Sequence, residues 1–390
     1  MNSDLLNTTI QKFITDHLQQ SISELALQKN PFPHIEWSKI LGQIGSKAKA
    51  IDKLPSWFSA ENIIYPSKIS IEQTSSEITA LYKSNLIFGE SLIDLTGGFG
   101  VDDYYFSKKF RKVVHCEINN ELSAIVAHNF KQLEAQNISC YSGDSMSFLE
   151  NNDEIYDWLY IDPSRRNEYK GKVFMLQDCL PNVPENLDFY FSKSKAILIK
   201  TAPLLDISAG LAELKNVKNI HIIALNNEVK ELLWELHKGY SGAATIKTVN
   251  LSKNKEDFFD IPATNCVPNF GIPELYLYEP NSAIMKSGGF DAVSSVFKLN
   301  KLHSNSHLYT NSELIDFPGR IFKIEKQFNY NKLAMKNALV NQKANITVRN
   351  FPESVENIRK KWKIKEGGNS YCFFTTDMNN NKIVLLCAKI

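Results

Sequence analysis

The sequence predicts an α/β protein with a doubly wound seven-stranded sheet, preceded by a helical domain and followed by smaller α+β modules. Three observations lead to this class. Apolar residues recur near a 3.6-residue period in the first 66 positions, seven short apolar runs alternate with helical stretches from residue 67, and the order of elements changes again after residue 260. With 390 residues, the chain is long enough for several domains.

Residues 1–66 form the predicted helical N-terminal domain. The segment LLNTTIQKFITDHL places apolar residues at helical spacing, and SKILGQIGSKAKAIDKL does so more weakly. Prolines at positions 31, 33, 55 and 66 interrupt the pattern, so we expect several short helices.

Residues 67–260 form the predicted core. Its strands are interpreted as the runs SLIDL, KVVHCEI, ISCYSGD, DWLYIDP, KAILIKT, NIHIIALN and ATIKTVNL. They are short and mostly β-branched, with helical stretches between most of them, which is typical of a parallel sheet. The later segment EVKELLW is interpreted as a helix. Ligands of such sheets bind beyond the carboxyl ends of the strands, so the residues there become candidates for a site.

The C-terminal part is predicted to form two α+β modules. The order strand–helix–strand–strand–helix–strand after residue 260 fits a small ferredoxin-like domain, placed at 261–338. Residues 339–390 form the last module, with a helix at SVENIRKKW and a hairpin of SYCFFTT and KIVLLCAK.

Composition indicates a cytoplasmic protein. The six cysteines form no CxxC pair, which suits reduced thiols rather than a disulfide frame. The N-terminus lacks the features of a signal peptide, and no window approaches eighteen apolar residues, so no membrane association is expected. Composition leaves the oligomeric state open.

One stretch departs from the near-neutral charge of the whole chain. Residues 320–365 contain twelve Lys or Arg and three Glu, a net charge of +9. Aromatic residues, among them Tyr330 and Trp362, lie within it. This pattern is compatible with RNA binding. The alternative interpretation is a solvated lysine face, because charge alone identifies no partner.

The segment SLIDLTGGFGVDDYYF predicts a cofactor site. Asp94 ends a strand, the following turn contains Gly97, Gly98 and Gly100, and a helix begins after it. Glycines let the backbone approach a ligand closely. Glu117 ends the next strand, 17 residues past Gly100, where a carboxylate can accept hydrogen bonds from both ribose hydroxyls.

Nicotinamide cofactors and S-adenosylmethionine (SAM) both use such a carboxylate. A pyrophosphate requires donor-rich N–H groups at the turn, and nearby anions oppose it. Asp94, together with Asp102 and Asp103 just after the turn, instead suits a cofactor that carries an ammonium and a sulfonium. SAM is therefore favoured over a dinucleotide.

Two later strand ends agree with this assignment. Asp144 follows the third strand, where it could accept from the adenine amino group, with Ser145 beside it; the alternative is a helix N-cap. Asp162 and Pro163 follow the fourth strand, where a methyl acceptor would lie.

Taken together, these motifs resemble those of a known protein family. Residues 67–255 resemble a class I SAM-dependent methyltransferase with a Rossmann-like sheet. Together with a basic C-terminal module, the motifs KLPSW, EQTSSEITALYK, DLTGGFGVD, DPSRR and NNEVKELLW resemble a bacterial group of methyltransferases with a THUMP-like C-terminal domain. The resemblance covers most of the chain. It implies SAM as cofactor, a THUMP-like domain at 339–390, and RNA (rRNA or tRNA) as partner, because THUMP modules deliver RNA to methyltransferase domains.

The favoured acceptor is an exocyclic amine of an RNA base. The Asp162 carboxylate and the carbonyl of Pro163 could accept the two amine hydrogens. In the usual motif of amino-methyltransferases a second proline and an aromatic follow, whereas Ser164 and Arg165 stand here. Tyr169 or another domain could supply the aromatic contact to the base. Arg165 and Arg166 could contact a phosphate, or form salt bridges with Asp157, Glu168 or Asp178.

Two alternatives to base-amine methylation by an enzyme stay open, and a third is excluded. Ribose 2′-O-methylation would use Lys83, Asp162, Lys200 and Glu228, which fall in the chain order of that tetrad, although Glu228 could instead cap a helix. A non-catalytic RNA-binding protein could retain the fold. Methylation at pyrimidine C5 lacks the required cysteine near the fourth or fifth strand end.

No metal is expected, because His303 and His307 lack a third ligand nearby. The TSSE motif predicts a capping box of Thr74 and Glu77, and its position allows Gln73 and Ser75 to fold over the cofactor. The predicted catalytic residues are Asp162, Pro163, Arg165 and Lys200. The predicted cofactor-binding residues are Gln73, Asp94, Thr96, Gly97, Gly98, Gly100, Asp102, Glu117, Ile118, Asp144 and Ser145.

Overall fold

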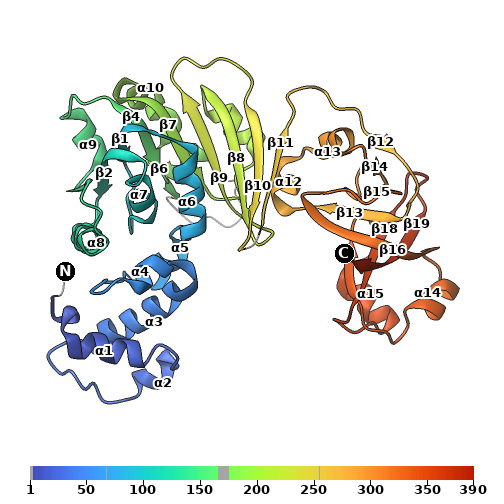
Figure 1. Ribbon diagram of the computed structural model, residues 1–390, viewed down its shortest axis with the longest axis horizontal. Helices are drawn as coiled ribbons and strands as arrows, with labels where there is room; N and C mark the ends of the chain where they lie inside the picture. Colours follow the sequence, from blue (N-terminus) through green and yellow to red (C-terminus); the bar gives the residue numbers. More distant parts are fainter. Residues whose placement is uncertain (1–2, 67, 166–174, 254) are drawn as a thin grey trace. The chain divides into compact units, whose positions relative to one another are not determined.

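The computed structural model describes residues 3–66, 68–165, 175–253 and 255–390. The chain divides into two compact units, which are described separately (Figure 1). The first unit comprises residues 1–218 and 232–242, and the second comprises residues 219–231 and 243–390.

The first unit contains helices followed by alternating strands and helices. Its elements are η1 (Ser3–Leu6), α1 (Thr8–Asp16), α2 (Ile22–Ala26), α3 (Trp37–Lys53), α4 (Pro55–Ser59), α5 (Lys68–Gln73), α6 (Glu77–Leu86), β1 (Gly89–Asp94), α7 (Val101–Phe106), β2 (Phe110–Glu117), α8 (Asn120–Gln132), β3 (Ile138–Ser142), α9 (Ser145–Glu150), β4 (Tyr156–Ile161), β5 (Ser164–Arg165), η2 (Leu176–Asp178), β6 (Cys179–Leu180), α10 (Val183–Lys193), β7 (Ser194–Thr201), α11 (Ile207–Glu213) and the larger part of β9 (Glu228–His237).

The strands of the first unit form a mostly parallel sheet. Strands β3, β2, β1, β4 and β7 pair in this order and in parallel, and β9 pairs antiparallel with β7. The register places Asp94 beside His115 of β2 and Tyr160 of β4, so the carboxyl ends of these strands meet at one edge. This arrangement confirms the predicted doubly wound sheet and positions the site.

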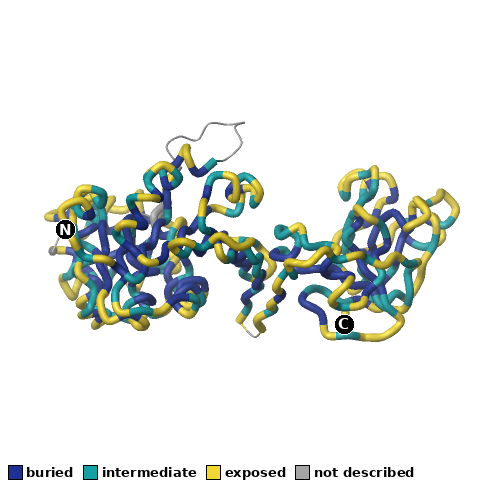
Figure 2. Tube along the Cα trace, turned by 90° about the horizontal axis from the view of Figure 1, so that it is seen from above, coloured by how far each residue is buried: buried dark blue, intermediate teal, exposed yellow. Residues whose placement is uncertain are grey.

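Two apolar clusters hold the N-terminal helices. One lies among the first helices themselves and includes Ile10, Ile40 and Ile44. The other joins α3 and α4 to α7 and α8, and it includes both Trp57 and Phe130. The buried residues follow the helix faces and the strands (Figure 2). The N-terminal helices therefore share a core with the helices that follow β1 and β2.

Two local predictions are wrong. The segment EVKELLW, predicted as a helix, is strand β9, whose residues 231–236 are all buried, as expected for an internal strand rather than an amphipathic helix. The predicted capping box is also absent, because Ser76 rather than Thr74 caps α6. Glu77 instead accepts hydrogen bonds from the backbone N–H and the hydroxyl of Ser56.

The second unit contains the remaining elements. They are β8 (Val217–Leu225), β10 (Thr245–Leu251), β11 (Glu256–Ile261), β12 (Asn269–Phe270), β13 (Tyr276–Pro280), α12 (Ser282–Ser287), α13 (Phe290–Phe297), β14 (Asn300–Lys301), β15 (Tyr309–Asn311), β16 (Gly319–Asn329), α14 (Lys332–Ala338), β17 (Asn345–Val348), α15 (Val355–Trp362), β18 (Ser370–Thr376) and β19 (Lys382–Lys389).

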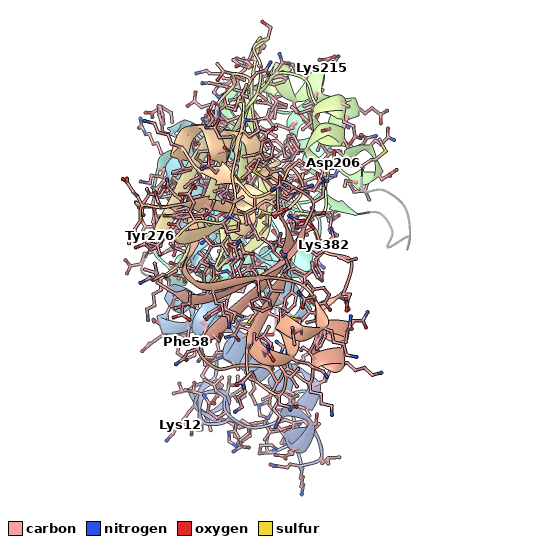
Figure 3. All side chains as sticks on the ribbon, turned by 90° about the vertical axis from the view of Figure 1, so that its right-hand side faces the viewer. Lys12, Phe58, Asp206, Lys215, Tyr276 and Lys382 are labelled. Carbon is pink, nitrogen blue, oxygen red and sulfur yellow. The ribbon has the colours of Figure 1, made fainter. Side chains whose placement is uncertain are left out.

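Strand β16 is the centre of the C-terminal sheet. The eight strands follow the order β12-β14-β15-β13-β16-β19-β18-β17. Strand β16 pairs with β13 on one side and with β19 on the other, both antiparallel. Tyr276 and Lys382, which Figure 3 labels, lie on these two neighbours. The two predicted α+β modules thus share one continuous sheet, and the predicted domain boundaries stay predictions.

None of the helices in the described ranges combines the length and the apolar character needed to cross a membrane.

Candidate functional site

The turn after β1 depends on its glycines in two ways. Gly97 packs directly on the imidazole of His115, and a Cβ at position 97 would lie 2.1 Å from that ring's Cε1. Gly98 has φ +57°, and the nearest heavy atom to a Cβ there would be 3.7 Å away. Gly97 is therefore required for close packing on His115, whereas Gly98 is required by its positive φ, since a Cβ there would meet only an ordinary contact with the Thr96 carbonyl oxygen. Gly100, with φ +73°, is the N-cap residue of α7.

Glu117 links the turn to the end of β2. Its Oε2 accepts the N–H of Gly98 at 3.0 Å, and its Oε1 accepts the N–H of Asn119 at 2.7 Å. A carboxylate has about four lone-pair sites, so acceptor capacity remains on both oxygens for hydroxyl groups of a ligand. The neighbouring Ile118 is 74% exposed, so its side chain is open to a ligand beside Glu117.

Asp94 is turned into the protein. Its Oδ1 accepts hydrogen bonds from the N–H and the hydroxyl of Thr96, at 2.7 and 3.1 Å. Burial, together with the nearby Asp103 carboxyl, raises the pKa of Asp94 well above its ordinary value. Asp94 therefore holds the turn from below, through Thr96, rather than presenting an exposed carboxylate.

Asp103 and His115 form a second buried contact under the turn. Nδ1 of His115 lies 2.6 Å from Oδ2 of Asp103, and both side chains are fully buried. Burial raises the pKa of Asp103 and lowers the pKa of His115, so burial favours the uncharged form of each group. Sequence analysis did not single out His115, because a lone histidine inside a strand carries no local signal.

Asp102, predicted to bind the cofactor, is the centre of a buried polar group that we call the lysine–aspartate cluster. Its Oδ1 lies 3.0 Å from Nζ of Lys83, and its Oδ2 accepts the hydroxyls of Ser75 and Tyr160 at 2.9 and 2.8 Å. The cluster comprises Ser75, Lys83, Asp102, Tyr160, Asp162 and Lys200.

Lys200 joins this cluster to the end of β4. Its Nζ lies 3.7 Å from Oδ2 of Asp102, donates to the Ser75 hydroxyl at 3.3 Å, and forms an ion pair with Oδ2 of Asp162. Lys83 donates to the same hydroxyl at 2.7 Å. Two lysines thus share one serine oxygen and one aspartate, and Lys200 also contacts Asp162.

The charges of the cluster balance. Burial alone would raise the pKa of Asp102, but Lys83 and Lys200 outweigh burial and lower that pKa. The Lys83 side chain is 0% exposed, and those of Lys200 and Asp102 are about one-tenth exposed. Removing one partner from such a group leaves an uncompensated buried charge, which typically costs about 3–5 kcal/mol.

Asp162 connects the cluster to the glycine-rich turn. Its N–H donates to the Thr96 hydroxyl at 2.7 Å, so the ends of β4 and β1 are tied together. Its side chain is 40% exposed, the most accessible member of the cluster's ion pairs. Pro163 is buried behind it. The geometry presents one carboxylate, held by Lys200, beside the turn.

The other predicted residues are not members of the lysine–aspartate cluster. Asp144 caps α9 and accepts the N–H and hydroxyl of Ser147, which lowers its pKa, so the alternative N-cap interpretation describes its contacts. Ser145 begins α9, and Gln73 ends α5 with an exposed side chain.

Several predicted residues lie at or beyond the limit of the described chain. The backbone of Arg165 forms β5 and pairs with Cys179 of β6, but its side chain lies outside the described residues. Arg166, Glu168 and Tyr169 also lie outside them. Asp157, one of the predicted partners of these arginines, instead contacts Lys195 at 2.7 Å.

The residues of the proposed ribose tetrad divide between the units. Lys83, Asp162 and Lys200 belong to the lysine–aspartate cluster of the first unit. Glu228 begins β9 in the second unit, where its Oε2 lies 2.6 Å from Nζ of Lys230. The predicted helix-capping role of Glu228 is wrong, because the segment is a strand.

Sequence analysis missed Tyr160 as a member of the site and gave Ser75 a different role. Ser75 was expected to fold over the cofactor, but it is 7% exposed and bound to the lysine–aspartate cluster. Tyr160 lies two residues before Asp162, and a tyrosine inside an apolar strand is the available signal for a buried polar partner.

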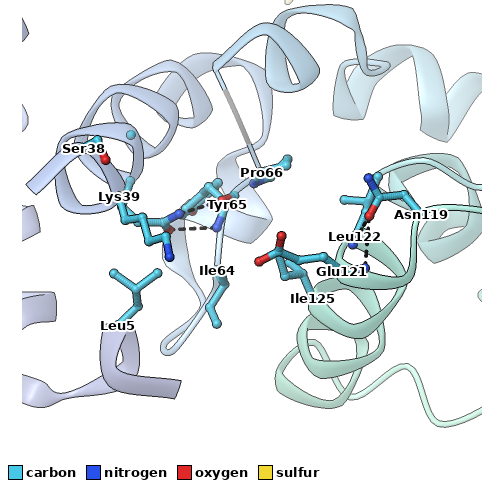
Figure 4. A pocket seen from close by; sticks show the side chains of 12 residues that line it. Leu5, Ser38, Lys39, Ile64, Tyr65, Pro66, Asn119, Glu121, Leu122 and Ile125 are labelled. Carbon is cyan, nitrogen blue, oxygen red and sulfur yellow. Dashed lines mark hydrogen bonds between the residues drawn. The ribbon is translucent and has the colours of Figure 1, made fainter. Parts of the chain in front are cut away.

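A pocket of about 460 Å³ opens beside the end of β2 (Figure 4). The N-terminal helices line one side through Lys39 and Gln43, and α8 lines the other through Leu122 and Ile125. The Gln43 side chain exchanges two hydrogen bonds with the backbone of Tyr65, at 2.6 and 2.9 Å, which fixes this wall. The N-terminal domain thus forms a concave surface next to α8, which sequence analysis did not anticipate.

No group of three or more His, Cys, Asp or Glu suited to a metal ion occurs within the described ranges. His303 and His307, considered as metal ligands from their spacing, have other contacts. His303 binds Asn350 and Asn380 through its ring nitrogens, and His307 stacks on Phe290 at 3.5 Å between ring centroids.

Comparisons with known proteins bear on this geometry. Residues 276–318 match a family model described as a ferredoxin-like domain, and residues 319–389 match one described as THUMP domain-like. No curated protein matches the chain. The sheet and the turn after β1 define a protein of the methyltransferase class.

A crystal structure matches the whole chain. It is that of a protein from Porphyromonas gingivalis W83 whose assignment as a methyltransferase is an inference; it is 30% identical, with a TM-score of 0.88, and the match covers 100% of this chain and 98% of that one. The chain belongs to this family of methyltransferases with C-terminal ferredoxin-like and THUMP-like domains.

Two further matches cover less than half of this chain. The TrmK protein of M. capricolum, solved with S-adenosyl-homocysteine, is 15% identical over 42% of this chain and 69% of its own, with a TM-score of 0.32. An rRNA methylase of Streptococcus thermophilus is 13% identical over 42% of this chain and 94% of its own, with a TM-score of 0.30. Scores this low do not bear on activity.

Proposed function

We propose that the protein transfers a methyl group from SAM to RNA, with Asp162 holding the acceptor. The observation that carries this proposal is the double attachment of Asp162. Its backbone is tied to Thr96 of the glycine-rich turn, and its carboxylate is tied to Lys200. A partly exposed carboxylate is thereby fixed beside the turn that would hold the cofactor. The THUMP-like match at residues 319–389 and the basic stretch within it support RNA as the substrate.

The residues of the turn fit SAM. Gly98 has no side chain that would keep a ligand from its backbone, and Glu117 keeps acceptor capacity for two ribose hydroxyls. Asp94 would act indirectly, by fixing Thr96 and the turn. When bound, SAM supplies a methyl group activated by its sulfonium. The contribution of the protein is then positioning, which can lower a barrier by roughly 7–11 kcal/mol.

An exocyclic amine is the acceptor that this geometry favours. Lys200 contacts Oδ2 of Asp162. In the proposed complex, Oδ1 would accept one amine hydrogen, and the carbonyl of Pro163 would accept the other. Both hydrogen bonds direct the nitrogen lone pair toward the methyl donor. The ion pair with Lys200 orients the carboxylate of Asp162 toward the place proposed for the amine.

Ribose 2′-O-methylation is the second candidate, because Lys200 touches Asp162 in a cluster that also contains Lys83. In that mechanism a lysine must accept the proton of the hydroxyl. The Nζ of Lys200 is already engaged with Asp102, Asp162 and the Ser75 hydroxyl, so its geometry suits holding Asp162 better than approaching a ribose hydroxyl. This argument places ribose chemistry second.

Two measurements test the proposal. Titration calorimetry with SAM should show binding by the wild type and loss of binding in Glu117→Ala. Nucleoside mass spectrometry of RNA incubated with enzyme and SAM should show a new methylated base. A methylated ribose would instead support the second candidate, and absence of SAM binding by the wild type would support the non-catalytic alternative.

A further inference from the structure

The second unit contains a pocket of about 680 Å³ with an unusual lining. Four lysines surround it: Lys332, Lys336, Lys361 and Lys363. Two aromatic residues, Tyr330 and Trp362, also line it, and none of its lining residues is acidic. The volume is in the range of small-molecule sites, roughly 300–1,000 Å³. We call this site the lysine pocket.

The lysines differ in how they are held. The ammonium of Lys361 contacts Oε1 of Glu353 at 3.0 Å and the hydroxyl of Tyr330 at 3.1 Å. Within the described ranges, no hydrogen bond or ion pair engages the ammonium groups of Lys332, Lys336 and Lys363. These three cations stabilise no described contact, yet they converge on one concavity. An anionic ligand would compensate their mutual repulsion.

The base of the pocket is apolar and rigid. Trp362 is 8% exposed and belongs to the core cluster of Met335 and Leu339. Its indole N–H donates to the Tyr330 hydroxyl at 3.0 Å, and the two rings meet edge to face. Val340 adds an aliphatic surface. The pocket therefore combines an apolar floor with a cationic rim, so it suits a ligand with a flat apolar part and an attached anion.

We infer that the lysine pocket binds one unpaired nucleotide of the RNA substrate, with its phosphates at Lys332, Lys336 and Lys363 and its base against the apolar floor. This inference deepens the proposed function and rests on RNA being the substrate. A duplex offers phosphates but keeps its bases stacked inside, so it would not fill the floor. An acidic peptide brings carboxylates without a flat base.

The test compares two triple variants of the full-length protein. Lys332→Ala, Lys336→Ala and Lys363→Ala together remove three charges from the pocket. Lys323→Ala, Lys326→Ala and Lys360→Ala remove three exposed charges of the same basic stretch outside the pocket. All six side chains are exposed, so both variants should fold, which circular dichroism verifies.

Binding of a labelled single-stranded RNA is measured by fluorescence anisotropy at several salt concentrations. We expect the pocket variant to lose affinity by about tenfold or more, and the magnitude of its slope of log K against log[salt] to fall by about 1.4, because each of the two phosphates that flank one nucleotide contributes roughly 0.7. The control variant should change affinity less than threefold. Duplex RNA of equal length should bind both variants alike. Inorganic polyphosphate should compete weakly, since it lacks a base.

Three results would overturn the inference. Equal losses of RNA affinity in the two variants would show that only the total positive charge of the basic stretch matters. Strong competition by polyphosphate would show a site for phosphate alone, and strong competition by polyglutamate would point to a protein partner. The outcome is separable from that of the proposed function. If RNA methylation were unchanged in the pocket variant, the inference about the pocket would be wrong and the proposed function would stand. If the pocket bound RNA but the wild type methylated none, the proposed function would be wrong and the inference about the pocket would stand.

Discussion

Lys83 in the first unit and Lys336 in the second carry the same charge in opposite surroundings. The Lys83 side chain is 0% exposed, and its ammonium lies 3.0 Å from Asp102 and 2.7 Å from the Ser75 hydroxyl. Lys336 is exposed, and its ammonium has no described partner. One lysine is fixed in a balanced network, while the other stands at the rim of a pocket.

The difference separates two uses of charge. A charge pair with little solvent around it interacts strongly, so its partners fix each other's positions. Exposed charges more than about 10 Å apart at 0.1 M salt are largely screened, and they act on an approaching anion rather than on the fold. We therefore expect substitutions in the lysine–aspartate cluster to alter stability and catalysis, and those in the lysine pocket to alter affinity and its dependence on salt.

Lys83→Met should have the largest effect on stability. It leaves Asp102 buried with Lys200 as its remaining cation, and Lys200 is then drawn from Asp162 toward Asp102. We expect the free energy of unfolding to fall by about 3–5 kcal/mol, measured by urea denaturation. The double variant Lys83→Met with Asp102→Asn should recover part of this loss, because it removes the uncompensated charge. Equal stability of the single variant and the wild type would contradict the view that this pair is a fixed network.

Asp162→Asn should cause the next largest effect, on activity rather than on folding. The side chain is 40% exposed, so the amide should be tolerated, but it replaces a charged acceptor and loses the ion pair with Lys200. We expect the methyl-transfer rate to fall roughly 100-fold, as is common when a reactant is misplaced by about 1 Å. SAM affinity should stay within twofold. Asp153→Asn, at an exposed position of the same unit, is the matched control. A rate loss explained by loss of SAM binding would argue against the role of Asp162 at the acceptor.

Most of the fold could be predicted, because its signals are local. Alternating short apolar runs and helices indicate a parallel sheet, and the Asp94 to Gly100 turn and Glu117 follow strand ends that any such sheet brings together. Strand β9 was mistaken for a helix, since its apolar residues are buried on both faces and leave no alternation.

The lysine–aspartate cluster could not be predicted as a unit. Its members come from α6, α7, β4, the residue after β4, β7 and the segment before α6, and only the fold brings them together. Asp102 was predicted to contact the cofactor from its place beside the turn. The direction of a side chain in the first turn of a helix depends on the residues that pack against it. The spacing of residues in the sequence does not identify those neighbours.

The acidic residues extend the comparison to pH. Asp103 is buried with a raised pKa, and Asp144 is exposed with a pKa lowered by its bonds to Ser147. A carboxyl with a raised folded pKa binds its proton more tightly in the folded state, so its contribution to stability declines as pH rises above the unfolded value of about 4. A lowered folded pKa has the opposite sign, and its contribution is lost as pH falls through that folded value.

Asp103→Asn should therefore become more stable relative to the wild type as pH increases from 4 to 8, while Asp144→Asn should become less stable relative to it as pH rises through the region below 4. Each comparison uses urea unfolding of wild type and variant at matched pH, so that other titrating groups cancel. Parallel curves for Asp103→Asn and the wild type would mean that this carboxyl titrates alike in the folded and unfolded states.

The prediction with the smallest expected effect compares a buried lysine with an exposed lysine of the same unit. Lys301 lies in the same unit as the lysine pocket, but its side chain is 3% exposed and lies 2.6 Å from Asp291, whose side chain is about half exposed. Lys301→Met should lower the free energy of unfolding by about 1–3 kcal/mol, because the charge of Asp291 is left partly desolvated. Lys336→Met, in contrast, should change it by less than about 0.5 kcal/mol. Both variants replace a lysine by methionine, and both are measured by the same urea titration. If their costs were equal, burial would not be what distinguishes the fixed lysines from the exposed ones, and the contrast between the cluster and the pocket would need another cause.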